Sequence, residues 1–364
     1  MNTILTKSIH KLLRHSPLTH GEFAVLLKNN SEKLRKVLAA AADETRRKYF
    51  GNRIFIRGLI EFTNYCHNNC FYCGIRCDNK NIKRYRLTHE DILSCCHQGY
   101  LSGFRTFVLQ GGEDTFFTDE KMIDLVTDIR NRFPDCAITL SLGERSRNSY
   151  RKLFNAGADR YLLRHETADE SHYGMLHPDS MSYKNRMYCL KELKAIGYQT
   201  GCGFMVGSPF QTTEMLAADL CFIQDFRPHM VGIGPFISHQ NTPFSDRKNG
   251  TLEDTLLLIS ILRLMQPALL LPSTTALGTI AENGRELGIL AGANVIMPNL
   301  SPASARKQYS LYDNKPCTGE ETLQGLQSLD EHMKNIGFQI TVDRGDFPEF
   351  TQRKEEQSCT IQNL

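Results

Sequence analysis

The sequence has little excess charge of either sign and no long uninterrupted apolar run. Its formal net charge is +3, from 43 basic and 40 acidic residues, which argues against a dedicated nucleic-acid binder. The apolar stretch at 256–265 is interrupted by Arg263 and is far shorter than the roughly 18 to 20 residues that a membrane-spanning helix needs. The basic stretch at 80–86 is expected to be a solvated loop. We therefore expect a soluble protein that binds neither nucleic acid nor membrane.

The chain also lacks the paired cysteine spacing of a disulfide scaffold, although it contains 12 cysteines. Such thiols are typical of a reducing compartment, so we expect a cytoplasmic protein. The first 21 residues carry no acid and include Lys7, Lys11 and Arg14, a composition shared with organellar transit peptides. An organellar location is thus the alternative, and an ordinary N-terminal helix is the preferred interpretation.

Short apolar or β-branched runs alternate with amphipathic stretches of helical length from Ile54 onward. The expected strands lie near 56–62, 105–110, 137–141, 160–165, 199–206, 229–234, 269–273 and 294–297. The expected helices lie near 88–101, 119–132, 147–156, 182–196, 212–225, 252–265 and 281–290. Because this alternation indicates a parallel sheet, eight strands predict an α/β fold, a closed (β/α)8 barrel of the TIM type.

Extensions are expected on both sides of the barrel. The predicted segments are an N-terminal helical extension (1–50), the barrel (51–300), a C-terminal segment that closes the barrel (301–345) and a polar, loosely ordered tail (346–364). Thr19 and Glu22 match a capping box at a helix start. Glycines that end a helix before the next strand are expected at Gly157, Gly197 and Gly292.

The most informative motif is a run of three cysteines, Cys66, Cys70 and Cys73, spaced CxxxCxxC directly after the first expected strand. Three thiolates can hold three irons of a [4Fe-4S] cluster and leave the fourth iron open to a substrate, whereas an electron carrier needs four thiolates. The carboxyl ends of barrel strands are also where active sites form. Spacing and position therefore both predict a catalytic cluster.

Two other metal sites compete with this interpretation. A zinc knuckle could form if a remote residue supplied a fourth ligand. Cys77 could complete a ferredoxin-like set of four thiolates, but ferredoxin spacing begins with a two-residue gap and ends before proline, whereas Asp78 follows here. We therefore interpret Cys77 as a free thiol near the site.

The cysteine run resembles the signature of the radical S-adenosylmethionine (radical SAM) superfamily, in which SAM chelates the open iron and is reduced to a 5′-deoxyadenosyl radical. The wider sequence, from about residue 50 to about 315, resembles the [FeFe]-hydrogenase maturase HydE family. The blocks that carry this resemblance are Ile60–Cys66, Val108–Asp114, Thr139–Glu144, Asp159–Thr167, Val231–Phe236 and Asn294–Asn299. It implies an enzyme that acts in assembly of the hydrogenase H-cluster.

The resemblance assigns Cys66, Cys70 and Cys73 to the cluster and implies a set of SAM-binding residues. These are Tyr72, Gly111, Gly112, Glu113, Ser141, Glu166 and Arg186. Tyr72 would lie near the adenine, and the Gly111–Glu113 turn would contact the SAM amino group, with glycines allowing close backbone approach. Glu166 suits ribose hydroxyls or the ammonium, and Arg186 suits the methionyl carboxylate. Alternatively, Glu166 and Arg186 could form a structural ion pair.

The substrate-side lining implied by the resemblance lies deeper in the barrel. Its residues are Thr139, Arg164, Met230, Thr274, Thr275, Ala276, Met297 and Tyr309. Arg164 would hold an anionic or carboxylate-bearing substrate, and Tyr309 would close the opening. For the two methionines, ordinary core packing is the competing interpretation.

The resemblance implies a cysteine-bound iron carbonyl cyanide complex as the organometallic substrate, a ferredoxin or flavodoxin as one-electron donor, and other hydrogenase maturation proteins as partners. Cys317 has no CxxC companion, so no second cluster is expected. Gly111 stands where the family often has serine, which puts one hydroxyl contact to SAM in doubt.

Three other functions remain open at this point. A biotin synthase needs cysteines on consecutive strands for a second cluster, and the expected fourth strand has none. A methylornithine synthase is harder to exclude, because its reaction needs no extra metal. An iron-sulfur electron carrier is the alternative that is not an enzyme.

Overall fold

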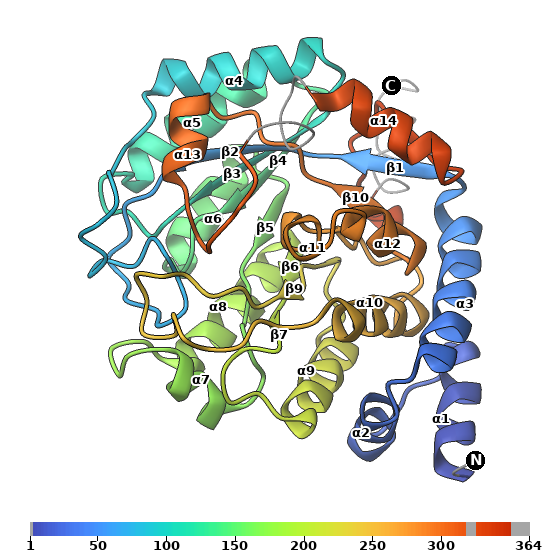
Figure 1. Ribbon diagram of the computed structural model, residues 1–364. Coiled ribbons are helices and arrows are strands. Elements are labelled where there is room, and N and C mark those ends of the chain that lie inside the picture. Colours follow the sequence, from blue (N-terminus) through green and yellow to red (C-terminus); the bar gives the residue numbers. More distant parts are fainter. Residues whose placement is uncertain (1–2, 318–324, 351–364) are drawn as a thin grey trace.

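The computed structural model describes residues 3–317 and 325–350. The chain begins with three helices, α1 (Thr3–Leu13), α2 (His20–Lys28) and α3 (Glu32–Phe50). Thr19 and Glu22 form the expected capping box at the start of α2. Helix α3 lies along α10 (Leu252–Met265) on the outer wall of the molecule, and α2 lies along α9 (Thr213–Phe226) (Figure 1).

The centre of the molecule is a six-stranded parallel sheet whose strands pair in chain order, except that β7 is skipped. Its strands are β2 (Gly58–Thr63), β3 (Thr106–Gly111), β4 (Ala137–Ser141), β5 (Arg160–Leu162), β6 (Gln199–Cys202) and β8 (Met230–Val231). Two short strands, β7 (Met205–Val206) and β9 (Gly234–Pro235), pair beyond β6 and β8. Parallel pairing throughout agrees with the expected α/β class.

The sheet closes on itself through single bridges and one short ladder. Met230 bridges Leu270, Pro272 bridges Val295, and β1 (Arg53–Ile56) pairs with β10 (Val295–Ile296). Leu59 then bridges Asn299, which completes the ring at β2. The expected strand at 269–273 is thus present only as isolated bridges, because Pro272 has no N–H to extend the ladder. The predicted TIM-type barrel is confirmed.

The helices that cover the barrel lie outside the sheet (Figure 1). Those that match expected helices are α4 (His89–Leu101), α5 (Asp119–Arg132), α6 (Arg147–Asn155), α8 (Tyr183–Ile196), α9 and α10. Those that the pattern did not indicate are α7 (Glu170–Leu176), α11 (Thr275–Ile280), α13 (Ala303–Gln308) and α14 (Leu326–Asn335). The helix expected at 281–290 begins later, as α12 (Gly284–Leu290). Gly157, Gly197 and Gly292 have φ of 115°, 110° and 116°, as helix-ending glycines require.

Alternate residues of each strand face the two sides of the barrel wall. On β2, Ile60 and Phe62 join the main apolar core beneath the helices. On the other face, side chains meet across the barrel interior: Arg160 of β5 donates to Thr106 of β3 at 3.1 Å, passing over β4. The interior therefore carries polar and charged residues, while the outer face of the wall supplies the apolar core.

The amino end of the barrel is closed by the C-terminal segment. Strand β11 (Gln339–Thr341) pairs with β1, and the chain then turns so that Asp346 accepts from Arg160 at 2.7 Å and from Arg344 at 2.8 Å. Residues 346–350 thus differ from the loose tail expected there, because two guanidinium groups hold Asp346 against the barrel. The rest of that tail, 351–364, lies outside the described residues, and the division into four segments remains a prediction.

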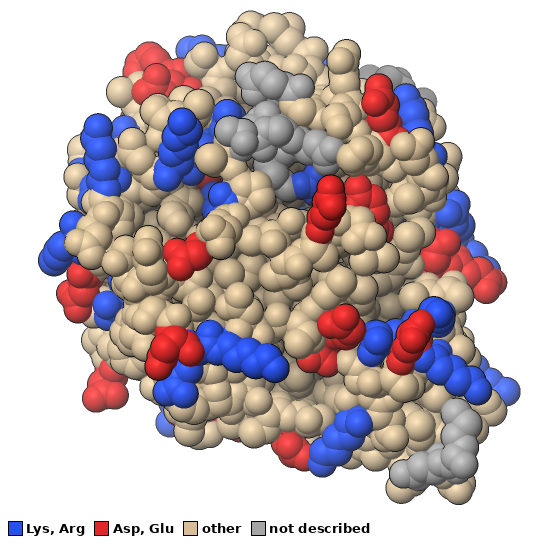
Figure 2. Space-filling view, in the orientation of Figure 1, with Lys and Arg blue, Asp and Glu red and all other residues tan. Residues whose placement is uncertain are grey.

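In the parts of the chain that the structure describes, no helix has the length and apolar character to cross a membrane. On the face shown in Figure 2, Lys and Arg side chains are interspersed with Asp and Glu. The mixed surface agrees with the near-balanced composition.

Candidate functional site

The three cysteines lie on the loop that follows β2, and Arg84 organises this loop from inside. Its guanidinium donates to the carbonyl of Asn64 and to those of Ile75, Arg76 and Asn79 at 2.8, 2.6 and 3.2 Å. One rigid, planar side chain thereby satisfies four backbone acceptors. The expectation that this basic stretch is simply a solvated loop is wrong for Arg84, because its guanidinium donates hydrogen bonds to backbone carbonyls of the loop instead of facing solvent.

The cysteine thiols are free, partly buried and close enough to influence one another. Burial raises the pKa of Cys66, and it raises the pKa of Cys73 to about 12. Burial also raises the pKa of Cys70, and the charges of Cys73 and Cys66 raise it further. Three buried sulfurs that repel each other's charge require a cation in order to ionise together.

This donor set fits an iron-sulfur cluster better than a single metal ion. Among the described residues, no three His, Cys, Asp or Glu side chains are grouped as ligands of one ion. A [4Fe-4S] cluster takes one thiolate per iron, so its protein sulfurs need not share a single coordination sphere. Cys66, Cys70 and Cys73 therefore could hold a cluster, and no group of side chains in the described part of the chain completes a zinc knuckle.

The glycine turn at the end of β3 packs against the cysteine loop. A Cβ atom on Gly112 would lie 2.2 Å from the carbonyl oxygen of Tyr65, and one on Gly111 would lie 2.7 Å from Thr63. The next residue, Glu113, donates its backbone N–H to Cys66 Sγ at 3.4 Å. These glycines thus let the turn pack closely against the end of β2 and the start of the cysteine loop. Their expected contact with SAM stays a prediction. Burial raises the pKa of the Glu113 carboxyl.

Arg186 and Glu166 do not pair with each other, so the alternative of a structural ion pair between them is wrong. Arg186 pairs with Glu144 at 2.5 Å and donates to the carbonyl of Arg164 at 2.7 Å. Glu166 Oε2 lies 3.1 Å from Arg164 Nη2. Glu144 is not among the expected site residues, yet it is the residue that fixes Arg186.

Glu166 also has an unusual backbone, with φ of 66°. A residue other than glycine in this left-handed region costs on the order of 1–3 kcal/mol and persists only where the surroundings impose it. Its N–H donates to the carbonyl of Gly203 at 3.0 Å. Strain of this kind gathers at functional sites, and no sequence pattern reveals it.

Several buried polar atoms that face the barrel interior have no hydrogen-bond partner. They are Thr139 Oγ1, Thr274 Oγ1, Arg164 Nε and Nη2, Glu166 Oε2, and Arg57 Nε and Nη2. The Arg164–Glu166 contact is short, but its angles are not those of a hydrogen bond. Because buried polar groups in native proteins are normally paired, this set fits a polar ligand. Arg57 was missed, although it follows β1 in the inward-facing register.

The two methionines lie in a separate apolar cluster. Met230 packs with Leu270 and Val295, and Met297 packs against them. Met230 Sδ also accepts a hydrogen bond from Arg57 Nη1 at 3.0 Å. This arrangement matches the core-packing interpretation, and contact of either methionine with a substrate stays a prediction.

The remaining expected residues lie at the carboxyl end of the barrel. Ser141 ends β4, Thr275 and Ala276 begin α11, and Tyr309 is the residue after α13. Tyr309 is 2% exposed and its hydroxyl accepts from Gln110 at 3.4 Å. Its carbonyl accepts from Lys315, which pairs with the buried Glu61 at 2.5 Å. The segment that carries Tyr309 is therefore tied to β2 and β3 inside the barrel.

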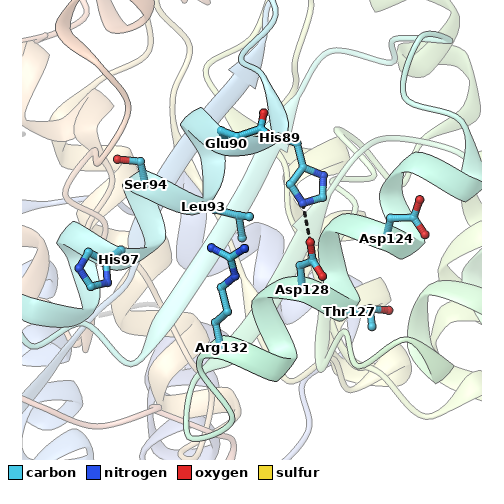
Figure 3. Close-up of a pocket in the computed structure, with 9 residues that line it drawn as sticks. All are labelled: His89, Glu90, Leu93, Ser94, His97, Asp124, Thr127, Asp128 and Arg132. Carbon is cyan, nitrogen blue, oxygen red and sulfur yellow. Dashed lines mark hydrogen bonds and ion pairs between the residues drawn. The ribbon is translucent and has the colours of Figure 1, made fainter.

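A separate groove of about 790 Å³ lies on the outer wall between α4 and α5 (Figure 3). Its lining residues are His89, Glu90, Leu93, Ser94, His97, Asp124, Thr127, Asp128 and Arg132. His89 of α4 and Asp128 of α5 bond across it at 2.9 Å. None of the expected site residues lines this groove, so it is not the candidate site.

Comparisons with known proteins agree with this geometry. Residues 60–223 match the model of the radical SAM superfamily. The [FeFe] hydrogenase maturase subunit HydE of Thermotoga maritima is 44% identical over 86% of this chain and 90% of its own. The 3-methylornithine synthase of Methanosarcina acetivorans is 29% identical over 90% and 92%. The crystal structure of methylornithine synthase (PylB) aligns with a TM-score of 0.80 and 28% identity, over 91% of this chain and 96% of that one. The chain therefore belongs to the [FeFe]-hydrogenase maturase HydE family, within the radical SAM superfamily.

Proposed function

We propose that this chain is a radical SAM enzyme that acts in assembly of the [FeFe]-hydrogenase H-cluster. The observation that carries the proposal is the cysteine loop at the carboxyl end of a closed barrel, above buried polar groups without partners, in a chain 44% identical to a HydE maturase. When bound by Cys66, Cys70 and Cys73, a [4Fe-4S] cluster supplies the electron that splits SAM into methionine and a 5′-deoxyadenosyl radical.

The chain's own residues would bind and orient the reactants. Arg84 keeps the cysteine loop in shape, and Glu144 holds the guanidinium of Arg186 in place for a carboxylate. Glu166 and Arg164 offer buried polar atoms of opposite charge that make no hydrogen bond. Thr139 and Thr274 offer hydroxyls to an anionic substrate, for which we propose a cysteine-bound iron carbonyl cyanide complex. The Tyr309 segment would exclude water from the reacting radical.

In vitro maturation of apo-hydrogenase, with this protein as the only variable, tests the proposal. We expect hydrogenase activity only when the protein, SAM and a reductant are all present. In parallel, dithionite and SAM should yield 5′-deoxyadenosine. Equal activity with and without the protein would refute the maturase role, and no 5′-deoxyadenosine together with no SAM-dependent change in the cluster's EPR signal would favour an electron carrier.

We further propose a single cluster, a ferredoxin or flavodoxin as electron donor, other hydrogenase maturation proteins as partners, and a cytoplasmic location. The cysteines of the described residues are all free, which suits a reducing compartment. Iron analysis of the reconstituted protein should find about four irons per chain, and clearly more would indicate a second cluster.

A methylornithine synthase is the second candidate, because this chain aligns with that enzyme's structure over nearly its whole length. Arg164, which contacts Glu166 at 3.1 Å but has two nitrogens without hydrogen bonds, would also suit an amino acid substrate. Formation of 3-methylornithine from a supplied amino acid, without any effect on hydrogenase maturation, would favour this candidate.

A further inference from the structure

Tyr72, which lies between Cys70 and Cys73, is fixed in place by a residue from another part of the barrel. Its hydroxyl lies 3.1 Å from Nε2 of His177, at the end of α7, and the two rings meet edge to face with centroids 5.4 Å apart. At the preceding residue, the N–H of Phe71 donates to the carbonyl of Leu176 at 3.0 Å. Two consecutive residues of the cysteine loop therefore rest on two consecutive residues at the end of α7.

The geometry around His177 determines which ring nitrogen carries the proton. Its Nδ1 lies 2.9 Å from the carbonyl oxygen of Tyr173, which can only accept, so Nδ1 must be the donor. In the neutral ring, Nε2 is then the acceptor, and the hydroxyl of Tyr72 must donate to it. Burial lowers the pKa of His177 to about 3, which keeps the ring neutral at physiological pH.

His177 itself has little freedom to move. Its side chain is 1% exposed, and its ring stacks on the ring of Tyr173 with centroids 4.0 Å apart. Asp169 caps the amino end of helix α7, and its side chain accepts from the N–H of His172 at 2.8 Å. The acceptor for the Tyr72 hydroxyl is thus held by a stacked ring and a capped helix, and Tyr72 in turn has one preferred ring orientation.

The ring of Tyr72 lies beside the groups that would receive SAM. Its phenol is within the electrostatic influence of Cys70, Glu166 and Arg186. We propose that His177 is a positioning residue, which fixes the ring plane of Tyr72 through one hydrogen bond and so shapes the surface on which SAM packs beside the cluster. This inference rests on the proposed function, because it names a determinant of cosubstrate binding at the same site.

The test compares SAM affinity among variants of the anaerobically reconstituted protein, measured by titrating SAM against the EPR signal of the reduced cluster. His177→Phe keeps a ring on Tyr173 but removes both nitrogens, and Tyr72→Phe removes only the hydroxyl. We expect each to weaken SAM binding about tenfold, as loss of one buried hydrogen bond would. The double variant should be no weaker than either single one, because both changes remove the same bond. His177→Gln, whose amide oxygen can accept, should recover most of the affinity.

Iron content, measured on the same samples, separates positioning from structural support. Wild-type iron content with weakened SAM binding supports the inference. Unchanged SAM affinity in His177→Phe, additive losses in the double variant, or loss of iron with normal SAM affinity in the remaining loaded protein would each overturn it. If the wild-type protein itself shows no SAM-dependent EPR change, the proposed function fails. If only the inference about His177 is wrong, the wild-type protein still shows that change and the variants alone depart from expectation.

Discussion

The two ends of the barrel differ in how far hydrogen bonds pair their buried charged side chains, although Arg160 Nε and two nitrogens of Arg57 lack a hydrogen bond toward the amino end as well. At the amino end, Arg160, Arg344 and Asp346 form a network of hydrogen bonds at 2.7–2.8 Å. At the carboxyl end, Arg164 and Glu166 keep buried polar atoms without hydrogen bonds. The same parallel wall supports both ends, so the difference lies in the side chains and in the segment that covers each end.

This contrast assigns stability to the amino end of the barrel and function to its carboxyl end. In TIM-type barrels, conserved chemistry lies at the carboxyl ends of strands, while the amino ends serve stability. Unpaired buried groups cost the folded protein free energy, and a ligand that pairs them recovers that cost. Substitutions at the amino end should therefore mainly lower the stability of the fold, and substitutions at the carboxyl end should mainly impair ligand binding and chemistry.

The largest effect is expected from Cys73→Ala at the carboxyl end. Loss of one of three thiolates should prevent stable cluster assembly, so 5′-deoxyadenosine formation should fall to the level of a protein-free control. The midpoint of thermal unfolding of the metal-free protein should change little, because the thiol is not part of the apolar core. Iron analysis and product chromatography check this. A variant that keeps its iron and its product would remove Cys73 from the cluster.

Asp346→Asn tests the amino end. Although burial alone would raise it, the guanidiniums of Arg160 and Arg344 hold the pKa of Asp346 well below its usual range. Removing the charge leaves the fully buried Arg160 without its carboxylate partner, whereas Arg344 keeps Asp159 at 2.8 Å, and the loss at Arg160 should cost about 3–5 kcal/mol in the free energy of unfolding. Denaturant unfolding measures this. Asp343→Asn is the matched control, because Asp343 is 41% exposed and 3.6 Å from Arg53, and it should change stability by under about 0.5 kcal/mol.

The pH dependence of Asp346→Asn has a definite sign. A carboxyl whose pKa is lowered by folding stabilises the protein fully above its unfolded pKa of about 3.9, and this contribution is lost as pH falls and the folded carboxyl is protonated. The difference between wild type and Asp346→Asn should thus be constant from about pH 5 to 8 and shrink below about pH 4. A difference that grows in acid would contradict the assigned ion pairs.

How much of this could be predicted depends on how local the signal is. The alternating strands, the helix-ending Gly197 and the three closely spaced cysteines are local patterns, and the structure contains them, except that the strand expected at 269–273 is reduced to isolated bridges. Partners remote in sequence were not predictable: Arg186 with Glu144 and Arg160 with Asp346 meet only after the barrel closes. The positive φ of Glu166 likewise arises from its surroundings and has no sequence signature.

Matched threonine variants, one with a paired and one with an unpaired buried hydroxyl, should change stability in opposite directions. Thr139→Val replaces an unpaired buried hydroxyl of β4, so we expect the free energy of unfolding to rise by about 1 kcal/mol. Thr106→Val, on neighbouring β3, removes a hydroxyl that donates to the backbone carbonyl of Arg344 at 2.7 Å and accepts from the guanidinium of Arg160 at 3.1 Å. Its expected cost is about 1–3 kcal/mol. Thermal unfolding of both variants without added SAM makes the comparison, and equal destabilisation would show that Thr139 is paired.

The smallest effect is expected from Cys77→Ala, which tests whether the cluster has three protein ligands or four. Cys77 lies close to the three candidate ligands in sequence and is near enough in space to help raise the pKa of Cys66, while its thiol makes a weak contact with Asp78 at 3.8 Å. If the fourth iron is open to SAM, removing this thiol should leave iron content and 5′-deoxyadenosine formation within about twofold of wild type. A cluster lost or stripped to fewer irons would instead make Cys77 a ligand. Four thiolates would close the coordination shell, and with no position left for SAM the carboxyl end of the barrel would lose the chemistry that separates it from the amino end.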